Sequence, residues 1–256
     1  MSFFNKVLAS VGIGAATVDT KLEKDQVIPG EEIKGIVEIR GGNTEQRIDD
    51  IYLALNTQYV KESDDKKYYV NATIERFRLA AAFTLKANER REIPFSFPLP
   101  LDTPVTVGKT KVWVTTGLDI KNAVDPSDKD YLKVVPNSLL NSVLNSLSSL
   151  GFRLREVECE QASYRMRNRL PFIQEFEFIP IAGSFRGRLD ELELVFVPTS
   201  STAADLWFQV DRKARGLGGF LSEAFEMDET NVRLSVTTND LPSLSSQIES
   251  LIRRYS

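Results

Sequence analysis

The sequence has no histidine among its 256 residues. Histidine is the commonest general base near neutral pH and the commonest metal ligand in proteins. Its absence excludes a Ser-His-Asp triad, a Cys-His pair and a histidine-based zinc site built within this chain. Any chemistry would have to rest on other groups, chiefly carboxylates.

Cysteine is almost absent as well. Cys159 is the only one, so no disulfide can form within the chain. A chain without disulfides suits a reducing compartment, and we predict a cytoplasmic location. The stretch that begins at Lys6 weakly resembles a secretory signal, but Gly12 and Gly14 interrupt its apolar run. We therefore expect no cleaved signal peptide.

Long apolar runs and a strong excess of one charge are also missing. No run approaches the ~18–20 apolar residues of a membrane-spanning helix. Lysine and arginine number 32 and aspartate and glutamate 36, for a formal net charge of −4. This mild acidity disfavours a protein whose main task is to bind nucleic acid.

What the sequence does contain is repeated two-residue alternation of apolar and polar side chains. Short alternating runs bounded by turn residues are typical of half-buried strands, and many such runs in succession indicate β-sandwiches. The inward-facing residues expected in the first half include Ile33, Val37, Ile39, Ile51, Leu53 and Leu55, and those in the second half include Phe176, Phe178, Leu192, Leu194, Leu206 and Phe208.

The centre of the sequence, residues 111–135, joins the two halves. We expect strands over 111–115, 118–120 and 131–135, with a turn at Asp125-Pro126-Ser127-Asp128. Proline residues 94, 98 and 100 indicate that the strand before this stretch lies at a sheet edge or bends, because proline cannot donate to a ladder.

The predicted domain boundaries follow from these patterns. An N-terminal β-sandwich occupies 1–136, a connecting helix occupies 137–150, and a C-terminal β-sandwich with a terminal helix occupies 151–256. The terminal helix is expected within 242–255, where apolar residues recur at helical spacing.

The connecting helix has a wide apolar stripe and an uncharged polar face. We expect Asn137 or Ser138 to cap its start and Gly151 to end it. Because exposed helix faces usually carry charge, this helix is interpreted either as a linker packed on its own protein or as a partner-binding element. The residues of this candidate interaction surface are Leu139, Leu140, Val143, Leu144 and Leu147.

Acidic residues near the centre raise two further hypotheses. Asp119, Asp125, Asp128 and Asp130 could suggest calcium, but their spacing lacks the glycine and glutamate positions of an EF-hand loop. Together with Asp49 and Asp50, some of these acids could also suggest a hydrolase with two catalytic carboxylates, which needs acids that face each other across a cleft. Turn chemistry is the preferred interpretation, and we predict no catalytic residue, no metal and no cofactor.

The first twelve residues form a separate candidate element. Phe3, Phe4, Val7, Leu8 and Val11 share one face of a short helix. We expect this helix to pack on the protein, with weak membrane-surface contact through residues 1–12 as the alternative.

Several segments resemble the bacterial sporulation-control M family. They are FFNKVLASVGIGAATVDT near the N-terminus, VIPGEEIKGIVEIRGGNTEQRID, the stretch 113–135, PFIQEFEFIP and FRGRLDELELVF. Members of this family are similar to the arrestins and to the cargo-binding subunit of retromer. The resemblance implies an all-β fold of two consecutive arrestin-like, immunoglobulin-like β-sandwich domains, with short helices at the N-terminus, between the domains and at the C-terminus.

The resemblance also implies a function. It implies a non-enzymatic, cytoplasmic regulator of sporulation initiation that acts as an arrestin-like adaptor for protein partners. The adaptor role rests on fold analogy, and no phosphate-sensing residue of the arrestins is carried over. A peripheral membrane scaffold and a carboxylate-based hydrolase are the alternatives, and a homo-oligomer is left open.

Overall fold

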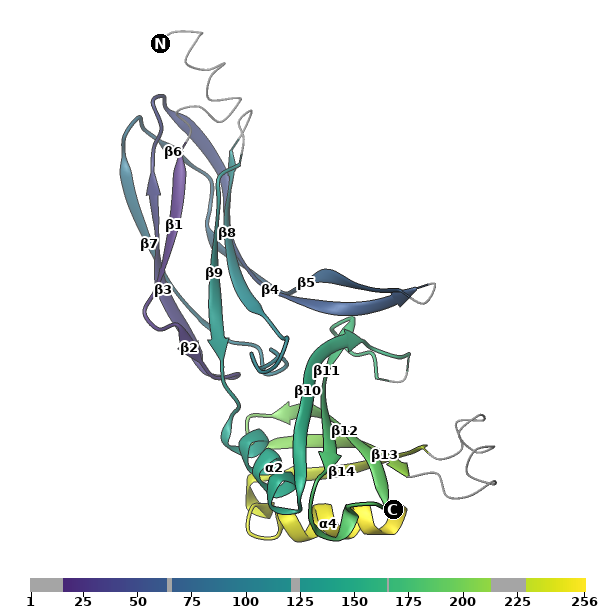
Figure 1. Cartoon of the computed structure of the whole chain (residues 1–256). Coiled ribbons are helices and arrows are strands. Elements are labelled where there is room, and N and C mark those ends of the chain that lie inside the picture. The colour runs from purple at the N-terminus through teal and green to yellow at the C-terminus, as the bar shows by residue number, and fades with distance from the viewer. Residues whose placement is uncertain (1–15, 64–65, 121–124, 165, 213–228) are drawn as a thin grey trace. The chain divides into compact units, whose positions relative to one another are not determined.

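The computed structural model in Figure 1 describes residues 16–63, 66–120, 125–164, 166–212 and 229–256. The predicted N-terminal helix, and with it the membrane contact predicted for residues 1–12, lies outside this range. The chain forms two compact units. Unit 1 comprises Met1–Gln58, Asn71–Thr106 and Lys111–Val134, and unit 2 comprises Tyr59–Val70, Val107–Thr110 and Val135–Ser256.

Unit 1 contains two β-sheets. The first has the order β1-β3-β7 and is antiparallel. The second is built on β4, β8 and β9, with β2 at its edge and β5 and β6 paired with β4. The bounds are β1 (Thr17–Leu22), β2 (Gln26–Val27), β3 (Glu32–Arg40), β4 (Gln46–Ser63), β5 (Lys66–Ala80), β6 (Phe83–Leu85), β7 (Arg90–Pro98), β8 (Val112–Ile120) and β9 (Ser127–Val134).

The core of unit 1 comes from the alternating residues of both sheets. Val37 and Ile39 of β3 and Leu53 and Leu55 of β4 are all fully buried. A hydrogen bond of 2.6 Å between the hydroxyls of Thr20 and Thr116 joins β1 to β8. The predicted sandwich is confirmed for this part of the chain.

Two details of the centre differ from the sequence expectation. β8 is one continuous strand across 112–120, where two strands were predicted, because Gly117 pairs with Tyr52 and remains within the ladder. A Cβ atom at Gly117 would lie 2.4 Å from the Tyr52 ring, so a glycine permits this close approach. β9 begins at Ser127, earlier than predicted.

Unit 2 is built on an antiparallel sheet in which consecutive strands pair in the order β14-β13-β12-β11-β10. Its inner face is rich in buried aromatic and aliphatic residues, among them Phe176, Leu194, Leu206 and Phe208. The bounds are β10 (Phe152–Gln161), β11 (Phe172–Pro180), β12 (Leu189–Ser200), β13 (Ala203–Arg212) and β14 (Glu229–Thr237).

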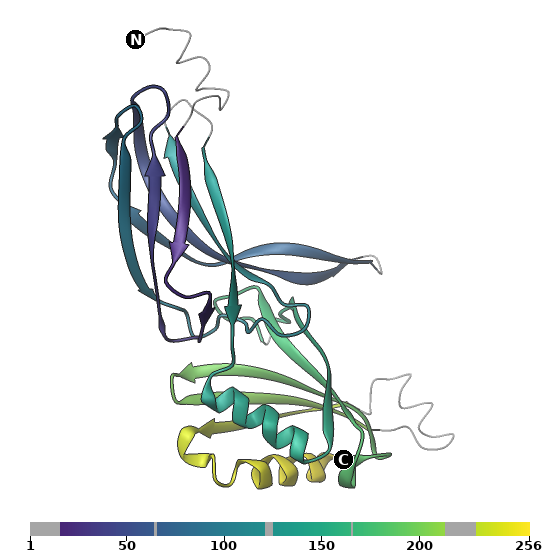
Figure 2. The same cartoon turned by 60° about the vertical axis from the view of Figure 1, so that its left-hand side comes forward.

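Two helices cover this inner face. Figure 2 shows α2 (Ser138–Ser149) and α4 (Leu244–Tyr255) side by side against the sheet, and α2 also contacts β10 while α4 contacts β14. Short 3₁₀ turns, η1 (Gly183–Phe185) and η2 (Thr238–Asp240), lie between the elements. The predicted all-β class with short helices is confirmed, and in unit 2 the layer opposite the sheet is helical.

The ends of α2 follow the predicted capping chemistry. The Asn137 side chain accepts a hydrogen bond of 2.9 Å from the backbone N–H of Leu140. Gly151 has a φ of +93°, which favours glycine at a helix end. In the part of the chain that the structure describes, no helix is both long and apolar enough to cross a membrane.

The packing of α2 leads to a first prediction. Leu147 is fully buried, so Leu147→Ala should lower the free energy of unfolding by about 2–5 kcal/mol. Asn145→Ala on the exposed side of the same helix is the matched control and should change it by less than about 1 kcal/mol. Urea titration of both variants followed by circular dichroism measures the difference. Equal, small effects would show that the apolar face of α2 is not core.

Candidate interaction surface on unit 2

The predicted interaction residues of α2 lie mostly inside unit 2. Leu139, Leu140, Val143 and Leu147 are between 0% and 4% exposed, and only Leu144 is half-buried. Their helix packs against β10, which follows it directly in the chain, and against α4, which lies too far away in the sequence to be recognised as a partner. As a correction to the sequence prediction, this apolar stripe is core and does not form an accessible surface.

The acids considered for catalysis are tied into local contacts. Asp50 accepts a hydrogen bond of 2.7 Å from Arg78, and Asp49 accepts one of 2.9 Å from Arg47. Asp125 accepts from the backbone N–H of Ile120 at 2.9 Å, which is the predicted turn chemistry. None of these three contacts places a carboxylate opposite another across a cleft.

Asp128 and Asp130 lie where β9 meets β1. Asp128 accepts a hydrogen bond of 2.7 Å from the backbone N–H of Thr20 and so helps to hold β1. Burial, followed by the nearby Asp128, raises the pKa of Asp130 to about 6. Within the described residues there is no group of three or more acidic or cysteine side chains that could hold a metal ion.

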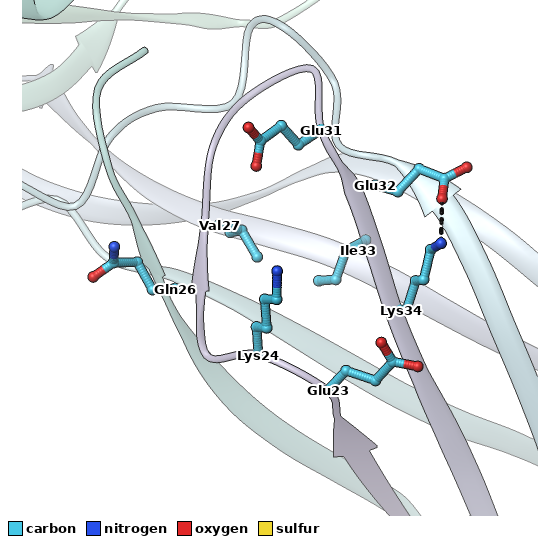
Figure 3. A pocket seen from close by; sticks show the side chains of 8 residues that line it. All are labelled: Glu23, Lys24, Gln26, Val27, Glu31, Glu32, Ile33 and Lys34. Carbon is cyan, nitrogen blue, oxygen red and sulfur yellow. Dashed lines mark ion pairs between the residues drawn. The ribbon is translucent and has the colours of Figure 1, made fainter. Parts of the chain in front are cut away.

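A pocket of unit 1 between β1, β2 and β3 is shown in Figure 3. Its rim is charged: Glu32 pairs with Lys34 at 2.7 Å, and Glu23, Lys24 and Glu31 stand around it. The hydrogen bond from Lys34 lowers the pKa of Glu32, so this glutamate stays ionised and is no proton donor. The pocket therefore offers surface charge without a catalytic arrangement.

The outer face of the unit 2 sheet carries rows of carboxylates. Strand register places Glu156 opposite Glu177 and Glu177 opposite Glu193 across β10, β11 and β12. The next row places Glu158 opposite Glu175. Like charges directly opposite each other on neighbouring strands are destabilising, so this arrangement has a cost in folding free energy.

Two cations offset part of that repulsion. Arg155 stands at a bulge in β10 and donates to Glu177 at 2.6 Å and to Glu191 at 2.5 Å. Lys109 forms an ion pair with Glu156. The hydrogen bond from Lys109 lowers the pKa of Glu156, while burial raises the pKa of Glu191 despite Arg155.

Glu175 is the most perturbed member of these rows. Burial raises the pKa of its carboxyl to about 8, and the neighbouring Glu193 adds to the effect. At neutral pH the side chain is therefore mainly protonated. A neutral Glu175 reduces the repulsion that Glu193 and Glu160 would otherwise exert on it.

The tip of the β4–β5 hairpin borders the same face within unit 2. The Tyr69 hydroxyl donates to Glu158 at 2.8 Å, and Val60 pairs with Glu160 in a parallel bridge. The rings of Tyr59 and Phe172 stack with centroids 5.7 Å apart. Residues on both strands of the hairpin are thus attached to the sheet of unit 2.

The rows of carboxylates were visible in the sequence only as alternating acids within single strands. Glu175 and Glu177 alternate with phenylalanine, and Glu191 and Glu193 alternate with leucine. Nothing in one strand says which residue of the next strand stands opposite. The repetition of this spacing in three successive strands was the available signal.

Glu175 leads to the second prediction. Because its pKa is raised in the folded state, the folded protein holds a proton that the unfolded chain releases as pH rises above about 4.5. The free energy of unfolding should therefore fall as the pH rises from about 4.5 to about 8, because the folded state keeps this carboxyl protonated. Glu175→Gln removes that dependence and should raise stability at pH 8 by up to about 4 kcal/mol, with little change at pH 4.5.

Thermal melts of the wild type and Glu175→Gln between pH 4.5 and pH 9 measure this difference. Glu45→Gln, an exposed side chain in unit 1, is the control and should follow the wild-type curve. A pH-independent difference between wild type and Glu175→Gln would contradict the raised pKa.

Comparison with known proteins identifies a family and a solved structure that are similar to this chain. The family model described as "SpoOM protein" matches residues 4–214. The sporulation-control protein spo0M of Bacillus subtilis (strain 168) is 46% identical over 258 residues, which cover 100% of this chain and 99% of that protein. The crystal structure of Spo0M, sporulation control protein, from Bacillus subtilis has a TM-score of 0.86 at 45% identity and covers 95% of this chain and 100% of that one.

These matches confirm the resemblance inferred from the sequence segments. The family model spans most of the chain, and the Bacillus subtilis protein aligns along its whole length. This chain belongs to the SpoOM protein family.

Proposed function

We propose that this protein regulates sporulation as a non-enzymatic, cytoplasmic adaptor that binds protein partners. The observation that carries the proposal is the 46% identity with a sporulation-control protein along the whole chain. The match covers both units, so the two proteins share their fold along the whole chain.

The adaptor role is supported by what the described surfaces offer. The outer sheet face of unit 2 is a broad array of charge, and the acids that could have served a hydrolase contact arginines or backbone N–H groups. Charged sheet faces that are partly open to solvent suit recognition of another macromolecule. The analogy with arrestins adds fold-level support only.

The third prediction tests the sporulation role. Expression of this chain in Bacillus subtilis that lacks its own sporulation-control protein should restore the parental frequency of heat-resistant spores, because the two chains match over their full lengths. Leu194→Asp, which buries a charge in the core of unit 2, is the negative control. A wild-type chain that accumulates normally but leaves sporulation unchanged would overturn the proposal.

The same complementation assay distinguishes the proposed adaptor role from the hydrolase alternative. The Asp49→Asn/Asp50→Asn variant removes the adjacent acids but breaks only exposed ion pairs, each worth about 1 kcal/mol or less. An adaptor should retain full complementation with this variant. A hydrolase that uses these acids should lose it.

A further inference from the structure

The sheet of unit 2 ends at β14. This strand pairs with β13 over its whole length, from Glu229 opposite Asp211 to Thr237 opposite Ala203, without a bulge. On its other side, no strand of the described residues pairs with it. A regular edge of this kind leaves a row of backbone N–H and C=O groups without a partner strand.

The hydrogen bonds of the ladder show which residues of β14 carry these groups. The N–H of Thr238 donates to the carbonyl of Thr202 at 2.9 Å, so the even-numbered residues of this strand face β13. Backbone groups of an antiparallel strand alternate between its two sides. The N–H and C=O groups of Asn231, Arg233 and Ser235 therefore point outward, as do those of residue 237.

Three of these outward positions are open. The N–H of Thr237 already donates to the carboxylate of Asp240 at 2.8 Å. In the part of the chain that the structure describes, the backbone groups of Asn231, Arg233 and Ser235 form no hydrogen bond, and all three residues are exposed. They present six unpaired backbone groups at the spacing of a β-ladder.

The edge of β7 in unit 1 is built differently. The N–H of Gly41 donates to the carbonyl of Glu89 at 2.8 Å, so the even-numbered residues of β7 point away from β3. Two of them are Pro94 and Pro98, which have no N–H to offer to a further strand. β14 contains neither a proline nor a bulge, so its edge remains able to accept a strand.

The occupant that fits such an edge is an extended peptide. Only a backbone in the β conformation presents donors and acceptors that alternate with the same spacing. On the inner face of β14, Val232 and Val236 are buried and Leu234 is half-buried. Apolar side chains of an added strand would lie beside these residues and extend the core.

Arg233 specifies the charge of the added strand. Its guanidinium donates to Asp205 at 2.5 Å on the outer face and lies 5.3 Å from the ring centroid of Trp207. Because a guanidinium has five N–H donors, Arg233 keeps donors for a second carboxylate. Opposite charges directly across two strands stabilise their pairing, so an acid opposite Arg233 is favoured.

We propose that the edge of β14 docks an extended segment of a partner protein, with apolar residues on the inner face and a glutamate or aspartate opposite Arg233. The segment adds a strand to the sheet of unit 2. The proposal rests on the adaptor role and identifies the surface and the class of partner that serve it.

Binding of a model strand is the fourth prediction. The probe is a fluorescently labelled nonapeptide in which threonine alternates with valine and a glutamate replaces the central threonine. Fluorescence anisotropy should show saturable binding to the full chain with a dissociation constant below about 1 mM. A peptide with a central lysine should bind roughly two- to fivefold more weakly. Arg233→Gln should remove this difference.

Proline substitution tests the backbone contact. Ser235→Pro removes an outward N–H but no hydrogen bond to β13, and should weaken binding at least roughly threefold. Ser235→Ala, which loses only the hydroxyl that donates to Asp205, should bind like the wild type. Ser96→Pro is the matched control, because Ser96 is an exposed outward residue on the edge of β7.

Modified peptides give a test that needs no variant protein. N-methylation of the central glutamate removes a donor that faces β14 and should weaken binding at least roughly threefold. N-methylation of the adjacent valine, whose N–H faces away, should have a smaller effect. Peptide binding should also slow hydrogen exchange at Asn231, Arg233 and Ser235.

Three results would contradict the proposal. They are no saturable binding at about 1 mM peptide, equal binding by Ser235→Pro and Ser235→Ala, and slowed exchange at another strand instead. Self-association of the wild type that only Ser235→Pro abolishes would assign the edge to a second copy and overturn the partner proposal. Complementation of sporulation is measured separately, so a failure of peptide binding would leave that role standing.

Discussion

Successive side chains along each strand point to opposite faces of a sheet. In both units the apolar side chains of neighbouring strands gather on one face of the sheet. In unit 2 this places Phe176, Leu194 and Phe208 in one layer and Glu175, Glu193 and Gln209 in the other. A shift of the register by one residue would bury the charged set and expose the phenylalanines, so burial of the apolar face determines the positions of the acids.

The acidic rows are a consequence of that constraint. Glu156, Glu177 and Glu193 stand opposite one another on neighbouring strands. They share the outer face because the residues that alternate with them along each strand belong to the core. Arg155, placed at a bulge, reaches two strands from an extra position outside the regular alternation. Glu175 lowers the remaining repulsion by keeping its proton, which links the charge of this face to pH near neutrality.

A charged sheet face without histidine has limited chemical uses. Ion pairs with Arg155 and Lys109 and a hydrogen bond from Tyr69 already occupy several of its carboxylates. This agrees with the proposed adaptor role, in which activity would depend on what the protein binds.

Much of the fold was predictable from local pattern. The alternation of Val37 and Ile39 or of Leu53 and Leu55 marks their strands, and the cap at Asn137 and the glycine at 151 mark the ends of α2, because these signals depend only on neighbours in sequence. The lack of histidine and the single cysteine likewise restrict the possible chemistry, since composition does not depend on how the chain folds.

Tertiary structure decided which faces are accessible. The stripe on α2 could equally have bound a partner, and only its contacts with α4 and β10 show that Leu147 is core. The carboxylate rows depend on pairing between strands far apart in the sequence, which the spacing within one strand does not specify. Composition and periodicity thus determined the elements and the excluded chemistry, whereas register and packing, which arise from non-local contacts, determined the surface available for function.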